Sequence, residues 1–463
     1  MPMATRIDPQ TSLIVFILTH SLTFGRDERT HMPANIADRS AYQSESILAE
    51  GVTLSNDTWS TDINCNQLVL GPSGSGKTRN FLKPNLLQAN SSFLVLDTKA
   101  LLYKEVGPVL ERLGYDVQMI NFAKVSGTVG YDPLDHIARN PMTGAPSQRD
   151  ILSVASAICP EESSKEPFWD HAAANYLASM IAAVVETFPT EEQTFDNVIA
   201  LFEEFSVEED RLKEYFASLQ ETNPDSFALK LYRRASCTQG AERMHASIMG
   251  IISEKLMCLG FEEAVALFRN HRRVDFNRMG HQKVALFVSI SDTEYALTPL
   301  TSLFVSQAIQ SLVREADACP GGRLPMPVRL FLDDFSNLVI PNFQKILSVT
   351  RSRELWCTIL CQSVAQLQEL YGREGAEGIL GNCDTQLVLA FQDNATAEAY
   401  ANRANKTPAS LLATPANTSW LFVRGWKPMM VRKYDLTTHE NFLETAEASS
   451  ETNEPSEEWR PMR

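Results

Sequence analysis

One glycine-rich octapeptide has the residue types and the spacing to hold a phosphate group. It fits the pattern G-x-x-x-x-G-K-[ST] at every fixed position. Glycines let the backbone approach an anion closely, and the N–H groups of the loop can then point at a β-phosphate. The pattern predicts ATP binding, with the lysine on the β- and γ-phosphates and the threonine hydroxyl on Mg²⁺. The residues of this phosphate loop are Gly71, Pro72, Ser73, Gly74, Ser75, Gly76, Lys77 and Thr78.

A pair of carboxylates could supply the second half of such a site. The apolar run Val328–Leu332 ends in Asp333 and Asp334. On a strand neighbouring the phosphate loop, Asp333 is expected to hold Mg²⁺ through water, and Asp334 to polarise the attacking water. The alternative is that the two acids merely end a strand.

Three further polar side chains are candidates for catalytic roles. Gln362 follows the apolar run Trp356–Cys361, where it could sense the γ-phosphate, although Ser363 beside it could simply cap a helix. Arg351, like Arg353, precedes that run and could act as an arginine finger on a neighbouring subunit. A solvated surface pair is the competing interpretation of the two arginines.

The elements that must position these residues alternate between short apolar runs and helical segments. The runs are continuous rather than alternating, which is typical of a parallel sheet covered on both faces. We therefore predict an α/β fold of the RecA-like P-loop type with a mostly parallel central sheet. The predicted strands are 67–70, 93–96, 117–120, 284–290, 328–332, 356–360, 387–391 and 420–423, and the predicted helices include 78–87, 297–316, 343–352, 363–371 and 395–405.

The interval 147–281 breaks this alternation and has helical periodicity almost throughout. We predict an all-helical domain inserted in a nucleotide-binding domain whose two parts are 46–146 and 282–440. An N-terminal extension, 1–45, would precede them, and a disordered acidic tail, 441–463, would follow.

Composition limits the possible classes of protein. The net charge of −16 disfavours a generic nucleic-acid binder, but the charge is uneven: residues 160–226 hold 16 acidic and 3 basic residues, and 227–283 hold 10 basic and 5 acidic residues. No apolar run approaches the ~20 residues of a membrane-spanning helix. We expect a cytoplasmic protein, with peripheral association at the inner face of the cell membrane as an open alternative. The eight cysteines and eight histidines form no pattern typical of a zinc site.

The motifs occur in a familiar order. GPSGSGKTRNFLKPNLL (71–87) resembles the phosphate loop of the TraG-like type IV coupling proteins, the ATPases that bring substrates to conjugation and type IV secretion channels. The stretch 91–105, with Asp97 and Lys99, is similar to the family's next strand and helix. Further similar stretches are 330–355, 360–372, 379–391 and 423–436. The resemblance implies a RecA-like motor with an inserted helical domain, assembled as a homo-hexamer with ATP sites between subunits.

Two departures from the family pattern bear on mechanism. Members typically begin with transmembrane helices, and this sequence has no intrinsic membrane span. Members also usually carry Asp-Glu where this chain has Asp333-Asp334. Aspartate is one methylene shorter than glutamate, and a catalytic carboxylate that is misplaced by about 1 Å can lower the rate on the order of 100-fold. We therefore expect ATP binding more firmly than fast hydrolysis.

Two functions remain open at this stage. The first is an ATPase that recruits or translocates DNA, as a relaxase–DNA substrate, to the components of a type IV secretion channel. We expect sequence-independent contacts to single-stranded DNA, and some of them would involve Arg233, Arg234, Arg269, Arg272 and Arg273. The alternative is that these arginines form a helical surface paired with the acidic stretch 160–226. The second is a slowly hydrolysing, nucleotide-gated adaptor for protein substrates. A GTPase is disfavoured because the segment Asn405–Pro408 lacks the aspartate of an N-K-x-D element, and a small-molecule kinase would have no use for the helical insertion.

Overall fold

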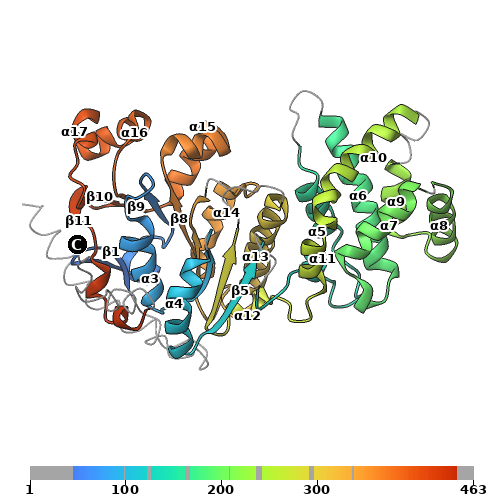
Figure 1. Ribbon diagram of the computed structural model, residues 1–463, viewed down its shortest axis with the longest axis horizontal. Helices are drawn as coiled ribbons and strands as arrows, with labels where there is room; N and C mark the ends of the chain where they lie inside the picture. Colours follow the sequence, from blue (N-terminus) through green and yellow to red (C-terminus); the bar gives the residue numbers. More distant parts are fainter. Residues whose placement is uncertain are drawn as a thin grey trace, which may run out of the picture. The chain divides into compact units, whose positions relative to one another are not determined.

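A nine-stranded sheet forms the centre of the chain (Figure 1). The computed structural model describes residues 45–98, 100–122, 127–161, 167–207, 209–235, 242–290, 297–335 and 338–445. The predicted N-terminal extension before residue 45, Lys99 and the predicted tail from residue 446 lie outside these ranges.

The strand order of the sheet is β11-β10-β9-β3-β8-β7-β4-β6-β5. All neighbours from β9 to β5 are parallel, and β10 and β11 add an antiparallel edge. The predicted mostly parallel α/β fold is therefore confirmed. The strands are β3 (Gln67–Leu70), β4 (Ser92–Leu96), β5 (Asp116–Asn121), β6 (Val284–Ser289), β7 (Val328–Leu332), β8 (Leu355–Cys361), β9 (Thr385–Val388), β10 (Thr418–Val423) and β11 (Met429–Arg432), beside a separate hairpin of β1 (Glu45–Ala49) and β2 (Val52–Ser55).

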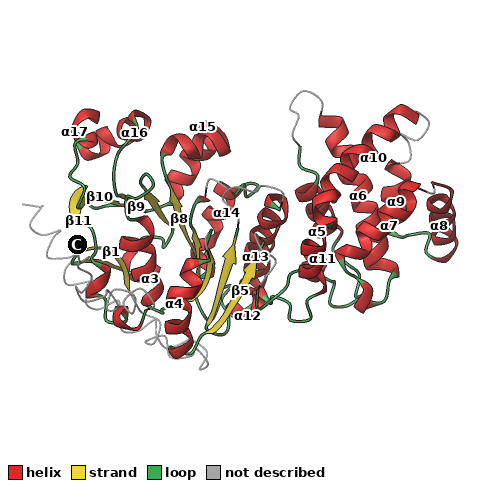
Figure 2. Ribbon diagram, in the orientation of Figure 1, coloured by secondary structure: helices red, strands yellow, loops and turns green. Residues whose placement is uncertain are grey.

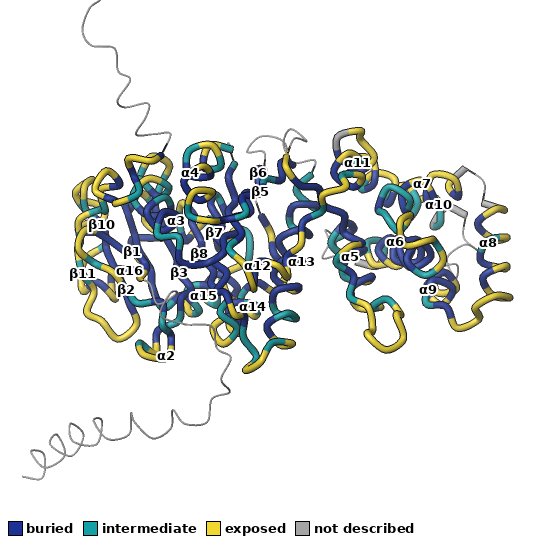
Figure 3. Tube along the Cα trace, turned by 90° about the horizontal axis from the view of Figure 1, so that it is seen from below, coloured by how far each residue is buried: buried dark blue, intermediate teal, exposed yellow. Residues whose placement is uncertain are grey.

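Side chains on the two faces of the sheet enter two separate apolar cores. In β3, Val69 faces one core, whereas Leu68 and Leu70 face the other. The core around Val69 includes residues of α3 (Lys83–Leu87) and α4 (Leu101–Arg112), and the other includes residues of α13 (Thr298–Ala318), α14 (Phe343–Thr350), α15 (Val364–Asn382) and α16 (Asn394–Ala404). Buried strands between exposed helix surfaces are visible in Figure 3. Burial on both faces explains why the strands read as continuous apolar runs.

In the described parts of the connection from β5 to β6, two strands that are direct neighbours in the sheet, the chain forms eight α-helices (Figure 2). They lie within the interval 147–281 for which the sequence predicts helix. Their bounds are α5 Gln148–Ile158, α6 Pro167–Thr187, α7 Phe195–Val207, α8 Glu209–Thr222, α9 Phe227–Ala235, α10 Glu242–Met257, α11 Glu262–Arg269 and α12 Phe276–Met279.

Buried Asp132, in the segment between β5 and α5, bonds to a residue of the helical interval. Its carboxylate accepts N–H bonds from Leu134 at 2.9 Å and from Phe195, at the start of α7, at 2.8 Å. Burial raises the pKa of Asp132 to about 7 despite these bonds and the nearby Arg273. The helices are thus joined to the sheet domain through hydrogen bonds as well as through the chain.

Several element bounds differ from the sequence prediction, and three differences concern β9, α15 and the C-terminal residues. Strand β9 begins at Thr385, two residues before the predicted run, because buried Gln386 satisfies its polar atoms locally: it donates to the carbonyl of Leu380 at 2.7 Å and accepts from Tyr400 at 2.7 Å. Helix α15 extends past Tyr371 to Asn382, with a kink at Gly372. Residues 442–444, which the sequence assigns to a disordered tail, form a 3₁₀ turn in which Phe442 is buried.

Within the described residues, every helix is too short or too polar to cross a membrane. The described ranges also contain two short α-helices, α2 (Thr58–Thr61) and α17 (Pro408–Leu412).

Candidate nucleotide site

A cavity of about 480 Å³ lies where β3, β4, β7 and β8 end. Its lining combines the phosphate loop with the carboxylates that follow β7 and with polar residues that follow β4 and β8. Ligands in open α/β sheets bind at this carboxyl edge. The lining residues are Ser73, Gly74, Gly76, Lys77, Thr78, Arg79, Lys83, Asp97, Thr98, Leu101, Leu102, Glu105, Asp333, Asp334 and Gln362.

Two glycines of the phosphate loop have backbone conformations that other residues rarely adopt. Gly74 has φ +76° and Gly76 has φ +96°. A Cβ on Gly76 would also lie 1.9 Å from Oδ1 of Asn80. The Asn80 side chain is held in this place, because its Nδ2 donates to the carbonyl of Tyr434 at 2.8 Å. The loop therefore needs glycine at position 76 for space as well as for its backbone angle.

The ammonium of Lys77 is buried beneath the loop. Its Nζ donates to the carbonyl oxygens of Gly71 at 2.7 Å and Pro72 at 3.3 Å, and the side chain is 8 % exposed. These carbonyls hold the cation at the base of the cavity, and an ammonium has a third proton with which it can contact a phosphate.

The helix after the loop begins with a wide turn that the sequence does not predict. Residues Lys77–Leu82 form a π-helix, in which the N–H of Lys83 donates to the carbonyl of Thr78, and α3 follows it. Pro84 has no N–H to continue an α-helical ladder at this point, which favours the wider turn.

Thr78 and Asp333 meet inside the cavity. The hydroxyl of Thr78 lies 3.0 Å from Oδ2 of Asp333, at the end of β7. Burial, followed by the charge of Asp334, raises the pKa of Asp333 to about 6, although the bond from Thr78 opposes the shift. A hydroxyl and a buried carboxylate oxygen at this separation form a suitable pair of oxygen ligands for Mg²⁺ or for its bound water.

Strand β7, the acid strand that precedes Asp333 and Asp334, lies one strand further from β3 than the sequence suggests. We expected β7 to neighbour β3, but β8 lies between them and pairs with both. The loop starts against the end of β8, where the N–H of Gly71 donates to the carbonyl of Cys361 at 3.2 Å.

Asp334 has a left-handed backbone conformation with φ +45°, which is uncommon outside glycine. Its Oδ2 accepts a bond from the hydroxyl of Thr98 at 3.3 Å, and its own N–H donates to Oδ1 of Asp333 at 3.0 Å. The conformation turns its carboxylate into the cavity instead of along the strand. Backbone strain of this kind is common where a side chain is positioned for function.

Gln362 lines the cavity from the end of β8, and Ser363 beside it caps α15 by accepting the N–H of Gln366 at 3.2 Å. The helix cap by Ser363 is thus confirmed, and a sensing role for Gln362 stays a prediction. Arg351 lies elsewhere: it approaches Asp62 at 3.6 Å and the carbonyl of Thr58 at 3.4 Å. Arg353 pairs with Asp317 at 2.8 Å. Neither arginine lines the cavity of its own chain, so a role on another subunit stays a prediction.

Sequence reasoning from the residues missed three contributors to the site. Thr98 and Asp97 follow β4 as Asp333 and Asp334 follow β7, so the rule that identified the acids would also have found them. Asp97 caps α4 by accepting the N–H groups of Leu101 at 3.1 Å and Tyr103 at 3.0 Å. The third is Lys433, whose Nζ donates to the carbonyl of Ser75 in the phosphate loop at 2.8 Å. No local pattern around residue 433 points to this contact.

The sequence matches the family model of type IV secretory system conjugative DNA transfer over residues 34–407. The chain belongs to this family. No curated protein sequence matches it significantly.

Solved structures of a coupling protein share the fold. The bacterial conjugative coupling protein TrwB, in an unbound form, has a TM-score of 0.61 and 17% identity, with 86% of this chain and 90% of that chain covered. TrwB in complex with the ATP analogue ADPNP has a TM-score of 0.60 and 15% identity, with coverage of 86% and 93%. TrwB with ADP and Mg²⁺ has a TM-score of 0.59 and 16% identity, with coverage of 86% and 93%. These likenesses support the RecA-like P-loop assignment for a member of the conjugative DNA transfer family.

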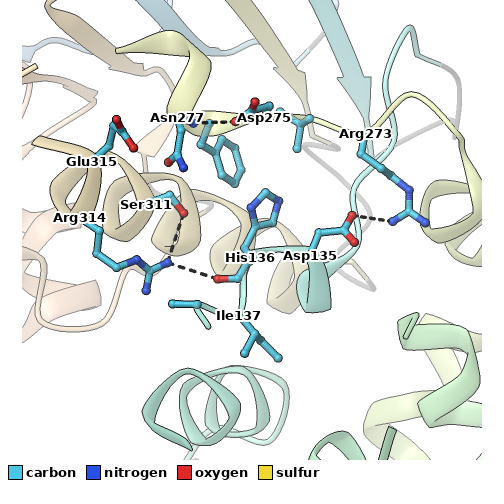
Figure 4. Close-up of a pocket in the computed structure, with 12 residues that line it drawn as sticks. Asp135, His136, Ile137, Arg273, Asp275, Asn277, Ser311, Arg314 and Glu315 are labelled. Atoms are coloured by element: carbon cyan, nitrogen blue, oxygen red, sulfur yellow. Dashed lines mark hydrogen bonds and ion pairs between the residues drawn. The ribbon is translucent and has the colours of Figure 1, made fainter. Parts of the chain in front are cut away.

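Most of the arginines considered for DNA contact form ion pairs within the chain. Arg269 pairs with Asp196 at 2.8 Å, and Arg272 pairs with Asp116 at 3.1 Å. Arg273 pairs with Asp135 at 3.0 Å, at the rim of a second cavity (Figure 4). Only the first partner belongs to the acidic stretch 160–226. The structure therefore favours pairing with the acidic stretch for Arg269, whereas Arg272 and Arg273 pair with acids outside that stretch.

Proposed function

We propose that this member of the conjugative DNA transfer family is a Mg²⁺-dependent ATPase that recruits or translocates DNA for a type IV secretion channel. The observation that carries the proposal is the 3.0 Å bond between Thr78 and Asp333, formed in a cavity that also holds Lys77. The residues fit a Mg²⁺–ATP complex because hydroxyl and carboxylate oxygens are the ligands that Mg²⁺ prefers. Bound Mg²⁺ would neutralise charge on the β- and γ-phosphates.

Each residue of the cavity has a role in this proposal. The N–H groups of the phosphate loop and Lys77 bind the phosphates, and Thr78 and Asp333 hold the metal or its water. Asp334 orients and polarises the attacking water, and Gln362 reports whether the γ-phosphate is present. Nucleotide and Mg²⁺ in the solved TrwB complexes support this assignment by analogy of fold.

The direct test is ATPase rate with and without single-stranded DNA. The expected result is Mg²⁺-dependent hydrolysis that DNA stimulates, because a motor couples turnover to its substrate. Lys77→Ala is the matched control, and it should hydrolyse ATP roughly 10²–10³ times more slowly than the natural protein, both with and without DNA. Hydrolysis that DNA leaves unchanged, in a folded and assembled protein, would contradict a DNA motor.

A basic cavity in the helical interval is our candidate for contacts to DNA phosphates. It has a volume of about 800 Å³, and four basic side chains but one acidic side chain line it: Arg149, Lys230, Arg234, Arg314 and Asp150. Arg314 pairs with Asp150 at 2.9 Å, and Lys230 lies 3.8 Å from Asp225. Across the ranges that the structure describes, no ion pair is found for the exposed Arg149 and Arg234. Their charges are therefore available to a polyanion.

We further propose a homo-hexamer in which Arg351 reaches the nucleotide of a neighbouring subunit. The side chain is 44% exposed, and its contact with Asp62, itself 91% exposed, is a surface ion pair of small energy. Sizing the protein with ATP and DNA tests assembly, with Lys77→Ala beside it. A protein that stays monomeric under all these conditions would exclude an arginine supplied in trans.

The second candidate is a nucleotide-gated adaptor that hydrolyses ATP slowly. The short side chain of Asp334, held by Thr98, favours it if the carboxylate stops short of the attacking water. Asp334→Glu separates the two functions. A sharp rise in turnover would support slow switching in the natural protein, whereas a fall would show that Asp334 already works as the catalytic base.

A further inference from the structure

A histidine that precedes β6 and two metal-ligating residues at the end of α13 lie close together. Nε2 of His281 lies 2.8 Å from Oε1 of Glu315, a residue 34 positions later. Sγ of Cys319 lies 3.8 Å from the same carboxylate oxygen. One ligand atom from each of the three residues lies within 4.8 Å of the others. We propose that His281, Glu315 and Cys319 bind a transition-metal ion, with Zn²⁺ as the expected natural occupant.

The backbone holds all three residues in place without a metal. Glu315 and Cys319 are four positions apart on α13, so they share one face of the helix. The N–H of Cys319 caps the helix by donating to the carbonyls of Glu315 at 3.0 Å and Ala316 at 3.2 Å. His281 follows α12, where its N–H donates to the carbonyl of Arg278 at 3.1 Å. Little ordering entropy is therefore left for metal binding to overcome.

The ligand set selects the kind of metal. Imidazole nitrogen, thiolate sulfur and carboxylate oxygen together suit Zn²⁺, whereas Mg²⁺ prefers oxygen alone. Bonds of about 2.0–2.3 Å in a tetrahedral site place neighbouring ligand atoms roughly 3.5 Å apart. The observed separations bracket this value, so shifts of about 1 Å close the site. Three protein ligands leave a fourth position for water, and the His281 side chain is 43% exposed, which gives the ion access.

The site is separate from the nucleotide cavity. His281 precedes β6, so the cluster lies near the amino end of that strand, and the nucleotide cavity lies at carboxyl ends of strands. Glu315 directly follows Arg314 on α13 (Figure 4). Arg314 pairs with Asp150 of α5 at 2.9 Å. A metal here would fix the end of α13 against the residues before β6, next to the ion pair that joins α13 to the helical interval.

The competing explanation is a surface His–Glu ion pair that happens to have a thiol beside it. Cobalt distinguishes the two, because Co²⁺ substitutes for Zn²⁺ and a thiolate ligand gives it an intense charge-transfer absorption. We would titrate Co²⁺ into the full-length, reduced protein without a polyhistidine tag. The expected result is one equivalent with thiolate charge transfer, displaced by one equivalent of Zn²⁺, with release of the Cys319 thiol proton on binding.

Variants then test the ligands one at a time. Cys319→Ser should abolish the charge-transfer band, and His281→Ala or Glu315→Gln should weaken Co²⁺ binding by tenfold or more. His271→Ala, an exposed histidine outside the cluster, should bind Co²⁺ as the natural protein does. Lys77→Ala should also keep the band, so failure of the ATPase proposal and failure of this one are distinguishable. A folded natural protein without the band, or a Cys319→Ser protein that retains it, overturns the proposal.

Discussion

The hydroxyl of Thr78 lies 3.0 Å from Oδ2 of Asp333, so the phosphate loop and the acid strand share a hydrogen bond although 255 residues separate them. The carboxylate is only 9 % exposed, and Lys77 lies in the same cavity. A buried carboxylate without a cation is unfavourable, which makes the pair a site prepared for Mg²⁺. The first two predictions follow from this relationship.

Mg²⁺ binding should weaken at low pH. Because the pKa of Asp333 is about 6, protons compete with Mg²⁺ below that pH, and the apparent Mg²⁺ affinity should fall by up to about tenfold per pH unit. Measuring ATPase rate against Mg²⁺ concentration at several pH values between 5 and 8 checks this. Added Mg²⁺ should restore the rate at pH 5, and circular dichroism should confirm that the protein is folded there. An unchanged Mg²⁺ requirement between pH 5 and 7 would argue against Asp333 as the metal-binding group.

Asp333→Asn should stabilise the metal-free protein at high pH. A carboxyl whose pKa is raised in the folded state contributes stability that is complete below the unfolded pKa of 3.8 and is lost as pH rises through about 6. At pH 8 the asparagine side chain, which does not ionise, avoids this loss of stability, which amounts to up to about 3 kcal/mol. Denaturant unfolding in EDTA should therefore show a more stable variant at pH 8 and a small difference near pH 4. Equal destabilisation at both pH values would show that the carboxylate is needed for packing.

Lys77→Ala should lower ATPase rate by roughly 10²–10³, since it removes a charged donor aimed at the transferring phosphoryl group. The substitution removes the ammonium that bonds to the carbonyls of Gly71 and Pro72, and we expect the protein still to fold. Steady-state kinetics and binding of a non-hydrolysable ATP analogue measure the two effects separately. Activity within tenfold of the natural protein would remove Lys77 from the catalytic group.

The sequence identified the parts of this site whose chemistry is local. Strands β3 and β7 have the predicted bounds because their buried runs end at a loop and at a pair of acids. The position of β8 between them was not predictable, since strand order depends on contacts between distant residues. The π-turn at Lys77–Leu82 was missed for a different reason: helical periodicity does not distinguish an α-turn from a π-turn over six residues.

Long-range side-chain contacts account for the remaining differences. The sequence shows no ligand pattern around His281, because its partners Glu315 and Cys319 reach it only after β6 and α13 pack together. The basic stretch illustrates the same limit. Counting charges identifies the stretch, but it does not show that Arg272 pairs with Asp116, a residue outside it.

Lys433 should position the phosphate loop for nucleotide. Its Nζ holds the carbonyl of Ser75 at 2.8 Å, and burial lowers the pKa of this lysine. Lys433→Met keeps the length of the side chain and removes the donor, so we expect KM for ATP to rise about tenfold with a smaller change in kcat. Arg432→Met, at the exposed neighbouring residue, is the control and should leave both constants unchanged. If both substitutions raise KM equally, the effect comes from the loss of positive charge near the cavity and not from the bond between Lys433 and Ser75.

Arg149 and Arg234 should contribute to DNA affinity through phosphate contacts. Each contact to a phosphate releases counterions, so the double variant Arg149→Ala/Arg234→Ala should bind single-stranded DNA more weakly. It should also reduce the slope of log affinity against log salt by between one and two. The loss should be the same for different DNA sequences, because phosphates carry no sequence information. Arg272→Ala removes an arginine that is paired with Asp116 and should change neither affinity nor slope appreciably. If the double variant keeps the natural salt slope while Arg272→Ala reduces it, the DNA path runs along the paired arginines, and the basic cavity beside α5 has another role.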